Sequence, residues 1–358
     1  MELEGRPDFD RTLERFEAWY RCQVADRPPV TVLHLWRPGA HLDAPTPPAD
    51  PRQRALDAEY RVAAFEAMLP CRLYVGDSFP AFSGDIASDQ DAAPFGGRLE
   101  FNETSNWAVP CLENVRDVLD LTLNLDDPCW AAVRQATELS LERSQGRWLT
   151  GLPFVAATGD TLVALRGPER LCLDLCDDPE GVRLACEHLS SFFPRLFDDV
   201  YAPIAARGLP IPLEGAVCPG RANRIGCDFL ALISVAMAEK ALYPSIERQI
   251  ESLDRSYFHL DSFGALKHLD WVLAQPKLAG VQWVYGANRG PAAKWIDVYQ
   301  RIQAAGKSIE LLPESVQDTL DVMAHLKPEG VWIKFFGGLS EDEARGLVRA
   351  AAKRSNWA

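Results

Sequence analysis

The second half of the chain alternates between short apolar runs and segments with helical spacing. The apolar runs, rich in β-branched and aromatic residues, span 256–262, 280–285, 308–312 and 330–336. Between them, apolar residues recur every three or four positions over 264–274, 291–305 and 315–325. Strands and helices that alternate with short connections predict a parallel sheet covered by helices.

The first half continues this alternation less regularly. Further strand candidates span 30–36, 72–79, 147–153 and 209–217. About eight strands in all favour a single (β/α)8 TIM-type barrel over residues 1–358. Residues 1–29, with an amphipathic helix at 8–25, predict an N-terminal helical extension. The Gly-, Asp- and Pro-rich segment 80–110 predicts an excursion near the barrel mouth that contains a small hairpin.

The run that ends before Gly264 carries the most distinctive chemistry. His259 and Asp261 are two residues apart, so in a strand their side chains share one face. They lie at the carboxyl end of that strand, where parallel α/β proteins bind ligands. The pair suits a metal or an oriented acid/base couple. The alternative is structural, with His259 donating to a backbone carbonyl and Asp261 capping the next helix.

Composition and charge exclude some partners. The net charge of −14 argues against nucleic acid or an anionic membrane as the main partner. The nine cysteines form no CxxC pair, which favours reduced thiols in a cytoplasmic protein over a disulfide framework. The polar start is unlike a signal peptide, and no apolar run approaches the roughly 18 residues of a membrane span. We therefore expect a soluble, cytoplasmic protein.

Several segments across nearly the whole chain share one resemblance. They are Phe16-Glu-Ala-Trp19, Asp26-Arg-Pro-Pro29, Asp160-Thr-Leu-Val-Ala-Leu-Arg-Gly167, Cys227-Asp-Phe229, Phe258-His-Leu-Asp261, Leu266-Lys-His-Leu269, Val281-Gln-Trp-Val284 and Ile302-Gln-Ala-Ala-Gly-Lys307. These segments resemble the uroporphyrinogen decarboxylase-like superfamily, which includes cobalamin-dependent methyltransferases. The resemblance implies a TIM-type barrel and a divergent member near the methyltransferase branch.

Departures from the family pattern narrow the chemistry that the resemblance implies. The family's decarboxylases grip substrate carboxylates with an arginine-rich motif, whereas only Arg37 follows the first strand here. Asp77 falls roughly where those enzymes place a catalytic aspartate. The family's methyltransferases bind zinc through His-x-Cys and a distant Cys. Here His259 matches, Asp261 replaces the first Cys, and no cysteine follows Cys227, which excludes a thiolate-rich site.

Two further carboxylates are candidates for a harder N/O metal site together with His259 and Asp261. Glu310 lies within a strand, and a barrel-interior carboxylate needs a partner. Glu214 lies late in a strand and is predicted either to face the mouth or to pair with Arg221 or Arg224. Zinc, manganese and iron are the ions that this ligand set favours.

The remaining candidates concern substrate binding. They are Arg37, Asp160, Arg221 and Trp283. Asp160 precedes a helix, so it is either a substrate ligand or a helix cap. Trp283 is either a stacking platform at the mouth or part of the core. Asp228 is interpreted as the cap of the helix that begins near Phe229.

Three functional hypotheses follow. The resemblance favours methyl transfer to or from a small molecule, with a corrinoid on a partner protein and a metal at His259 as Lewis acid. The second hypothesis is a carboxylate-driven lyase, decarboxylase-like chemistry included, or a glycoside-type hydrolase that uses Asp77, Glu214 and Asp261. The third is a ligand-binding barrel without catalysis, which the loss of the family's Arg and Cys signatures favours.

Overall fold

A parallel sheet of six strands dominates the computed structural model, which describes residues 3–353 and 357. The strand order is β1-β12-β11-β10-β9-β8. The bounds are β1 (Val30–Val32), β8 (Ala222–Gly226), β9 (Arg255–Asp261), β10 (Leu278–Val284), β11 (Ser308–Leu311) and β12 (Val331–Phe335). From β8 to β12, neighbours in the sheet are also neighbours in the chain, so the predicted β-α alternation of the second half is confirmed.

Three two-stranded pairs complete the strand set of the described residues. β2 (Ala81–Ser83) and β5 (Leu149–Gly151) are parallel. β3 (Arg98–Phe101) and β4 (Asn106–Val109) form the hairpin predicted within 80–110. β6 (Ile211–Leu213) and β7 (Ala216–Cys218) form a second antiparallel hairpin.

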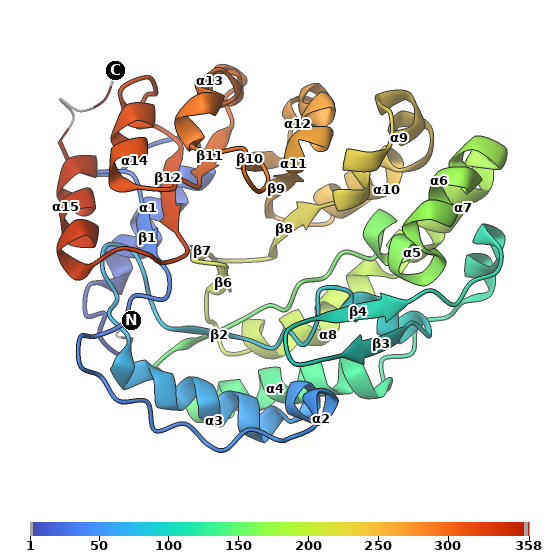
Figure 1. The fold of residues 1–358 in the computed structure, drawn as a ribbon, viewed down its shortest axis with the longest axis horizontal. Helices are drawn as coiled ribbons and strands as arrows, with labels where there is room; N and C mark the ends of the chain where they lie inside the picture. Colours follow the sequence, from blue (N-terminus) through green and yellow to red (C-terminus); the bar gives the residue numbers. More distant parts are fainter. Residues whose placement is uncertain (1–2, 354–356, 358) are drawn as a thin grey trace.

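Helices cover the outer side of the strands, which surround the middle of the molecule (Figure 1). The α-helices are α1 (Phe9–Tyr20), α2 (Pro51–Leu56), α3 (Ala58–Met68), α4 (Pro128–Ser144), α5 (Gly159–Arg166), α6 (Pro168–Asp177), α7 (Pro179–Ser191), α8 (Phe193–Ala205), α9 (Val235–Ala241), α10 (Tyr243–Glu251), α11 (Ser262–Ala265), α12 (Leu269–Ala274), α13 (Ile296–Ala304), α14 (Val316–Met323) and α15 (Glu341–Ala351). The 3-10 segments are η1 (Leu69–Cys71), η2 (Gln90–Phe95), η3 (Val115–Asp120), η4 (Asp228–Leu232), η5 (Leu266–His268) and η6 (Ala292–Trp295). In the part of the chain described, no helix has both the length and the apolar character to cross a membrane.

Aromatic packing from α1 fills the amino end of the main sheet. Trp19 donates from Nε1 to the carbonyl of Ile309 at 3.1 Å, and its ring lies 5.6 Å from the rings of Tyr257 and Trp332. Phe16 packs edge-on against Trp332 at 5.2 Å. Large buried rings stabilise this end through their apolar area. The carboxyl ends of the strands are therefore the end at which polar side chains can meet a ligand.

The strand predicted at 72–79 is wrong. This segment forms only two isolated bridges, Thr31 with Gly76 and Trp36 with Arg72, and regular pairing starts later, at β2. Gly76 has a φ of +68°, and an added Cβ would lie 2.4 Å from the carbonyl oxygen of Val30. This turn interrupts the extended backbone before a ladder can form.

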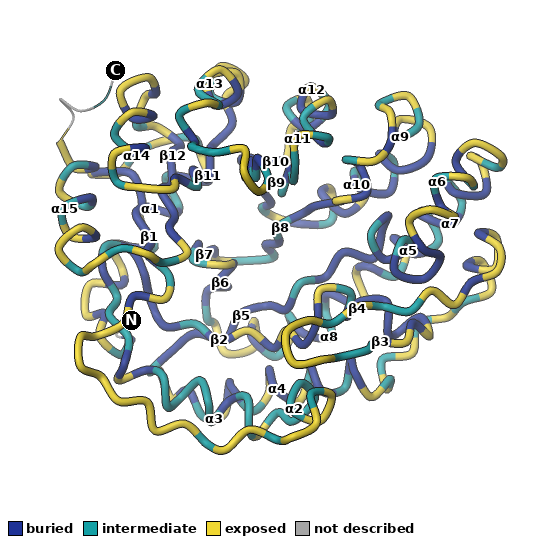
Figure 2. Tube along the Cα trace, in the orientation of Figure 1, coloured by how far each residue is buried: buried dark blue, intermediate teal, exposed yellow. Residues whose placement is uncertain are grey.

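The strand predicted at 209–217 is instead the β6–β7 hairpin. Its two central residues, Glu214 and Gly215, have φ values of +46° and +102°. Two successive positive φ angles are typical of the tight turn that joins two antiparallel strands. β8 was not predicted, because Ala222-Asn-Arg-Ile-Gly226 has few β-type residues. Most strand residues are buried, whereas the segment between β1 and α2 is exposed along most of its length (Figure 2).

Candidate functional site

A chain of polar side chains crosses the main sheet at the carboxyl side of its strands. Each of the five strands from β8 to β12 contributes one residue. They are Arg224, His259, Gln282, Glu310 and Lys334. The parallel register places His259 beside Gln282 and Gln282 beside Glu310. Gln282, Glu310 and Lys334 are fully buried, so their polar groups need partners within the protein.

The donors and acceptors on either side of Gln282 determine which way its side-chain amide is turned. Lys334 Nζ donates to Glu310 Oε1 at 2.8 Å, and Gln282 Nε2 donates to the same oxygen at 2.6 Å. The amide oxygen of Gln282 therefore faces His259 and accepts a hydrogen bond from its Nδ1. A proton on Nδ1 leaves the lone pair of neutral His259 on Nε2. This is the arrangement of metal-binding histidines, whose second nitrogen donates to an oxygen of the protein.

Three potential metal ligands converge around that free nitrogen. One ligand atom from each of Asp228, His259 and Asp261 lies within 4.8 Å of the others. Asp228 begins η4 directly after β8, and its Oδ1 lies 3.7 Å from His259 Nε2. The i, i+2 spacing on β9 thus brings His259 and Asp261 together, as the sequence analysis expects. The third candidate ligand is Asp228 rather than Glu214 or Glu310.

The local backbone creates room for these ligands. Gly226 pairs in register with His259, and an added Cβ there would lie 3.2 Å from the His259 Cβ. Ser262, directly after Asp261, has a φ of +67°, which is uncommon for a residue other than glycine. Desolvation at the mouth raises the pKa of Asp228, and the Asp261 carboxylate raises it further against the opposing effect of His259. Two neighbouring carboxylates of this kind favour a cation between them.

Asp160 holds the backbone at the start of η4. It accepts hydrogen bonds from the backbone N–H groups of Asp228 and Phe229 at 2.9 and 3.1 Å. Burial, followed by the charge of Asp228, raises the pKa of Asp160 to about 7. Asp160 therefore holds the start of η4 and with it the position of Asp228.

Glu214 links the polar chain to a cavity. Its Oε2 lies 2.7 Å from Arg224 NH1 and 3.4 Å from Lys334 Nζ. Burial alone would raise the pKa of Glu214, but Arg224 and Lys334 outweigh it and lower the pKa. Its left-handed backbone is a costly conformation of the kind that concentrates at functional sites. The predicted pairing of Glu214 with Arg224 is confirmed, and both residues line the cavity.

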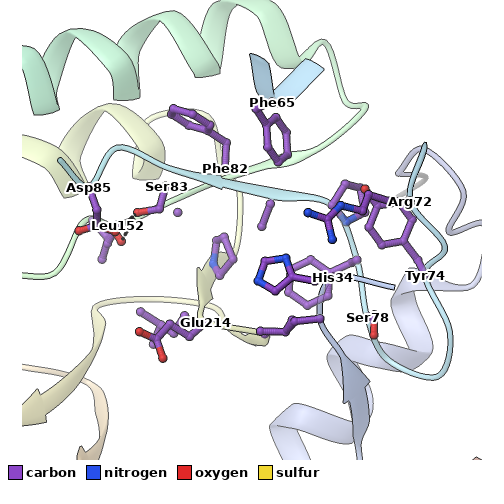
Figure 3. A pocket seen from close by; sticks show the side chains of 18 of the residues that line it. His34, Phe65, Arg72, Tyr74, Ser78, Phe82, Ser83, Asp85, Leu152 and Glu214 are labelled. Atoms are coloured by element: carbon purple, nitrogen blue, oxygen red, sulfur yellow. Dashed lines mark hydrogen bonds between the residues drawn. The ribbon is translucent and has the colours of Figure 1, made fainter. Parts of the chain in front are cut away.

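The cavity has a volume of about 330 Å³ and lies between β1, β2, β5, β6 and β8 (Figure 3). Its walls are mainly apolar and aromatic, with a few polar groups. The cavity wall includes Tyr257, which lies two residues before His259 on β9, although none of the three candidate ligands lines the cavity itself. A mostly apolar pocket with a few convergent polar groups is typical of a small-molecule site.

Asp77 lies outside this arrangement. It is fully buried and pairs with Arg15 at 2.8 Å and Arg27 at 2.6 Å. It also accepts a hydrogen bond from the backbone N–H of Val30 at 2.8 Å. Asp77 itself does not line the cavity, whereas the residues that follow it, Ser78 to Ser83, do. The carboxylate of Asp77 therefore stabilises the packing of α1 against the start of β1.

The other predicted residues lie at different places. Arg37 is exposed, and its Nε donates to the carbonyl of Pro70. Arg221 lies at the amino end of β8 and pairs with Asp198. Trp283 is fully buried and packs edge-on against Trp295 at 5.4 Å. Glu310 is the central acceptor of the polar chain.

Gln282, Lys334 and Asp228 as a candidate ligand were not predicted from the sequence. Gln282 and Lys334 each interrupt an otherwise apolar strand, in Val281-Gln-Trp-Val284 and Val331-Trp-Ile-Lys-Phe335. A polar residue at the centre of a buried strand is the signal that identifies them. Asp228 lacks such a signal, because its position depends on where β8 ends.

Neither family models nor curated proteins match this chain significantly. The features of the molecule that bear on function are therefore the arrangement of Asp228, His259 and Asp261 and the cavity.

Proposed function

We propose that this protein is a metal-dependent barrel enzyme, resembling the uroporphyrinogen decarboxylase-like superfamily, that transfers a methyl group to or from a small molecule. The observation that carries the proposal is the convergence of Asp228, His259 and Asp261 beside the cavity. A corrinoid on a partner protein is the methyl carrier that the resemblance implies.

The strand arrangement supports the barrel. The main sheet holds β1 and β8 to β12, and the β2–β5 pair adds two more parallel strands. β12 pairs with β1, as the last strand of a (β/α)8 barrel pairs with the first, whereas the β2–β5 pair forms a separate sheet among the described residues. The isolated bridge between Thr31 and Gly76 connects β1 to the segment before β2. The hairpin β6–β7 lies between β5 and β8 in the chain.

The ligand set suits a borderline or hard divalent ion. One imidazole and two carboxylates match zinc, manganese or iron, and no thiolate is required. Cys227 adjoins Asp228 in the chain, but its thiol is buried, which raises its pKa well above the usual value. Three protein ligands at the edge of a mouth leave further coordination positions for a substrate atom.

The proposed roles follow from position and charge. Asp228, His259 and Asp261 would hold a divalent ion, which would supply Lewis-acid polarisation of the acceptor heteroatom. The cavity would hold the body of the acceptor. Glu214 would take the proton that the heteroatom loses as its bond to the methyl carbon forms and the bond between the methyl group and its corrinoid carrier breaks. Arg224 and Lys334 keep Glu214 ionised for this step. Gln282 presents His259 Nε2 to the ion.

Methyl transfer is tested with methylcobalamin as donor and a panel of small thiols, amines and phenols as acceptors. The metal-loaded wild type is expected to demethylate the corrinoid, followed by its absorbance, and His259→Ala is expected to lose more than 90% of that rate, on the order expected for a lost metal ligand. His325→Ala, a histidine on the exposed end of α14, serves as control. Equal rates in wild type and His259→Ala would refute the proposal.

A second candidate, a carboxylate-driven lyase or hydrolase, is favoured by the opposite pKa shifts of Glu214 and Asp228. The lowered pKa suits a base, and the raised pKa suits an acid. This alternative predicts turnover in the presence of chelator, with loss of activity in Glu214→Gln. Turnover that requires added metal would exclude it.

A further inference from the structure

Arg72 is the unmatched charge of the cavity wall. Among the described residues it has no carboxylate partner, and its NH1 is buried without a hydrogen bond. The guanidinium stacks on the ring of Trp36 at 4.3 Å, and its NH2 contacts the Met68 sulfur at 3.8 Å. Neither contact neutralises the charge, so Arg72 is held in place but not paired.

The other charged side chains of the cavity wall already have partners. Glu214 pairs with Arg224 at 2.7 Å. Asp85 accepts from the backbone N–H of Phe154 and from Gln90 Nε2, both at 2.6 Å. A half-buried guanidinium without a counter-charge is costly in an apolar wall, because it loses hydration without gaining an ion pair.

A second hydrogen-bonding group lies beside Arg72. The ring of His34 points into the same end of the cavity as the Arg72 guanidinium (Figure 3). His34 has a φ of +57°, so its backbone is held in a conformation that is rare outside glycine. Partial desolvation, followed by the charge of Arg72, lowers the pKa of His34, which favours the neutral ring. This end therefore offers one positive charge and a neutral imidazole.

The body of the cavity next to this end is aromatic. Phe65, Phe79, Phe82 and Phe154 belong to the wall, and Met68 adds a flexible apolar side chain. A volume of about 330 Å³ is at the lower end of the range of about 300–1,000 Å³ for small-molecule pockets. The ligand is therefore a small molecule with an apolar body.

We propose that the cavity binds a small monocarboxylate with an apolar body of about the size of an aromatic ring. The carboxylate of this ligand pairs with Arg72, and the apolar body packs against the four phenylalanine side chains of the wall. A carboxylate matches one guanidinium in charge and geometry, whereas a phosphate dianion requires further cations or backbone donors. The inference names the substrate class of the proposed methyl transfer and in that respect rests on the proposed function. The binding step itself requires neither metal nor turnover.

The test is calorimetric titration of chelator-treated protein with phenylacetate, 3-phenylpropanoate and 4-phenylbutanoate, each paired with its neutral amide. At least one acid is expected to bind about tenfold or more tightly than its amide, the usual gain of a charge-assisted hydrogen bond. In Arg72→Gln that preference should disappear. Arg37→Gln, at an exposed arginine that does not line the cavity, should keep it.

Two results would overturn the inference. One is that no acid of the panel binds the wild type more tightly than its amide. The other is that Arg72→Gln, with a circular dichroism spectrum like that of the wild type, retains the full preference. Acid binding that is unchanged in His259→Ala would support the cavity inference even if the metal proposal failed, so the two failures are distinguishable.

Discussion

Two buried charge clusters lie in different parts of this fold. They differ in whether every carboxylate oxygen has a hydrogen-bond partner. At α1 and the start of β1, both oxygens of Asp77 are filled by Arg15, Arg27, Thr12 and the backbone of Val30. Across β10 to β12, Oε1 of Glu310 accepts two hydrogen bonds, whereas its Oε2 has no partner among the described residues.

The difference separates a structural cluster from a functional one. The Asp77 cluster joins α1 to β1 and leaves no free acceptor, so further ligands have no place in it. The chain from Lys334 through Glu310 and Gln282 ends at His259, whose Nε2 faces Asp228. The nearby hydroxyl of Tyr257 is buried without a partner and belongs to the cavity wall. Buried polar atoms that lack a hydrogen-bond partner and lie next to a cavity favour a role in binding or catalysis.

The largest expected effect is on stability, for Asp77→Asn. This change removes the charge that Arg15 and Arg27 share in a buried site, and we expect a loss of about 4–5 kcal/mol in the free energy of unfolding. Urea denaturation measures it, with Asp43→Asn on the exposed segment before α2 as control, expected within about 0.5 kcal/mol. Metal affinity of the folded variant should not change. A stability loss below 1 kcal/mol would contradict the structural role.

Lys334→Met should cost less, about 3 kcal/mol, because Glu310 can take up a proton once its partner is lost. The double variant with Glu310→Gln removes the unpaired charge and should recover part of this loss. Urea denaturation of the single and double variants decides the point. A double variant that is less stable than Lys334→Met would contradict the unpaired charge of Glu310 as the cause of the loss.

Gln282→Leu tests the connection between the polar chain and His259. Without the amide oxygen, Nδ1 loses its acceptor and the imidazole is free to change tautomer. Loss of such a supporting hydrogen bond typically lowers metal affinity by about 10–100-fold. Titration with Mn²⁺ or Zn²⁺ measures the effect, with Gln317→Leu on the exposed face of α14 as control. Unchanged affinity in Gln282→Leu would separate the polar chain from the metal ligands.

The sequence predicts the region around His259 better than the region around Asp77. From β9 to β12, apolar runs alternate with helical spacing, so strand positions and the shared face of His259 and Asp261 follow from periodicity. In the first half, strands of three residues are too short for an alternation of apolar and polar positions to identify them. The turn at Gly76 interrupts the segment that was predicted to be a strand. Gln282 and Lys334 lie within apolar strands, and their partners come from neighbouring strands that sequence spacing does not specify.

The smallest expected effect concerns pH. Asp26 hydrogen-bonds Arg15 at the edge of the Asp77 cluster, which lowers its pKa from 3.8 to about 2 against the opposing effect of burial. A carboxyl with a lowered pKa stabilises the folded state above pH 4 and loses that contribution as the pH falls toward 2. The melting temperature of the wild type should therefore approach that of Asp26→Asn over this window. A difference in melting temperature between wild type and Asp26→Asn that stays constant from pH 5 to pH 2 would contradict the lowered pKa of Asp26.

The most direct test of the central claim is metal content, measured by elemental analysis after purification without chelator and by titration with Mn²⁺, Zn²⁺ and Fe²⁺. One of these ions is expected to bind stoichiometrically to wild type and to the His325→Ala control. Binding should be lost in His259→Ala, and equally in Asp228→Asn, because the proposed ion lies at the three converging residues rather than at Glu214 or Glu310. Absence of binding in the wild type, or equal binding in His259→Ala, would contradict the central claim.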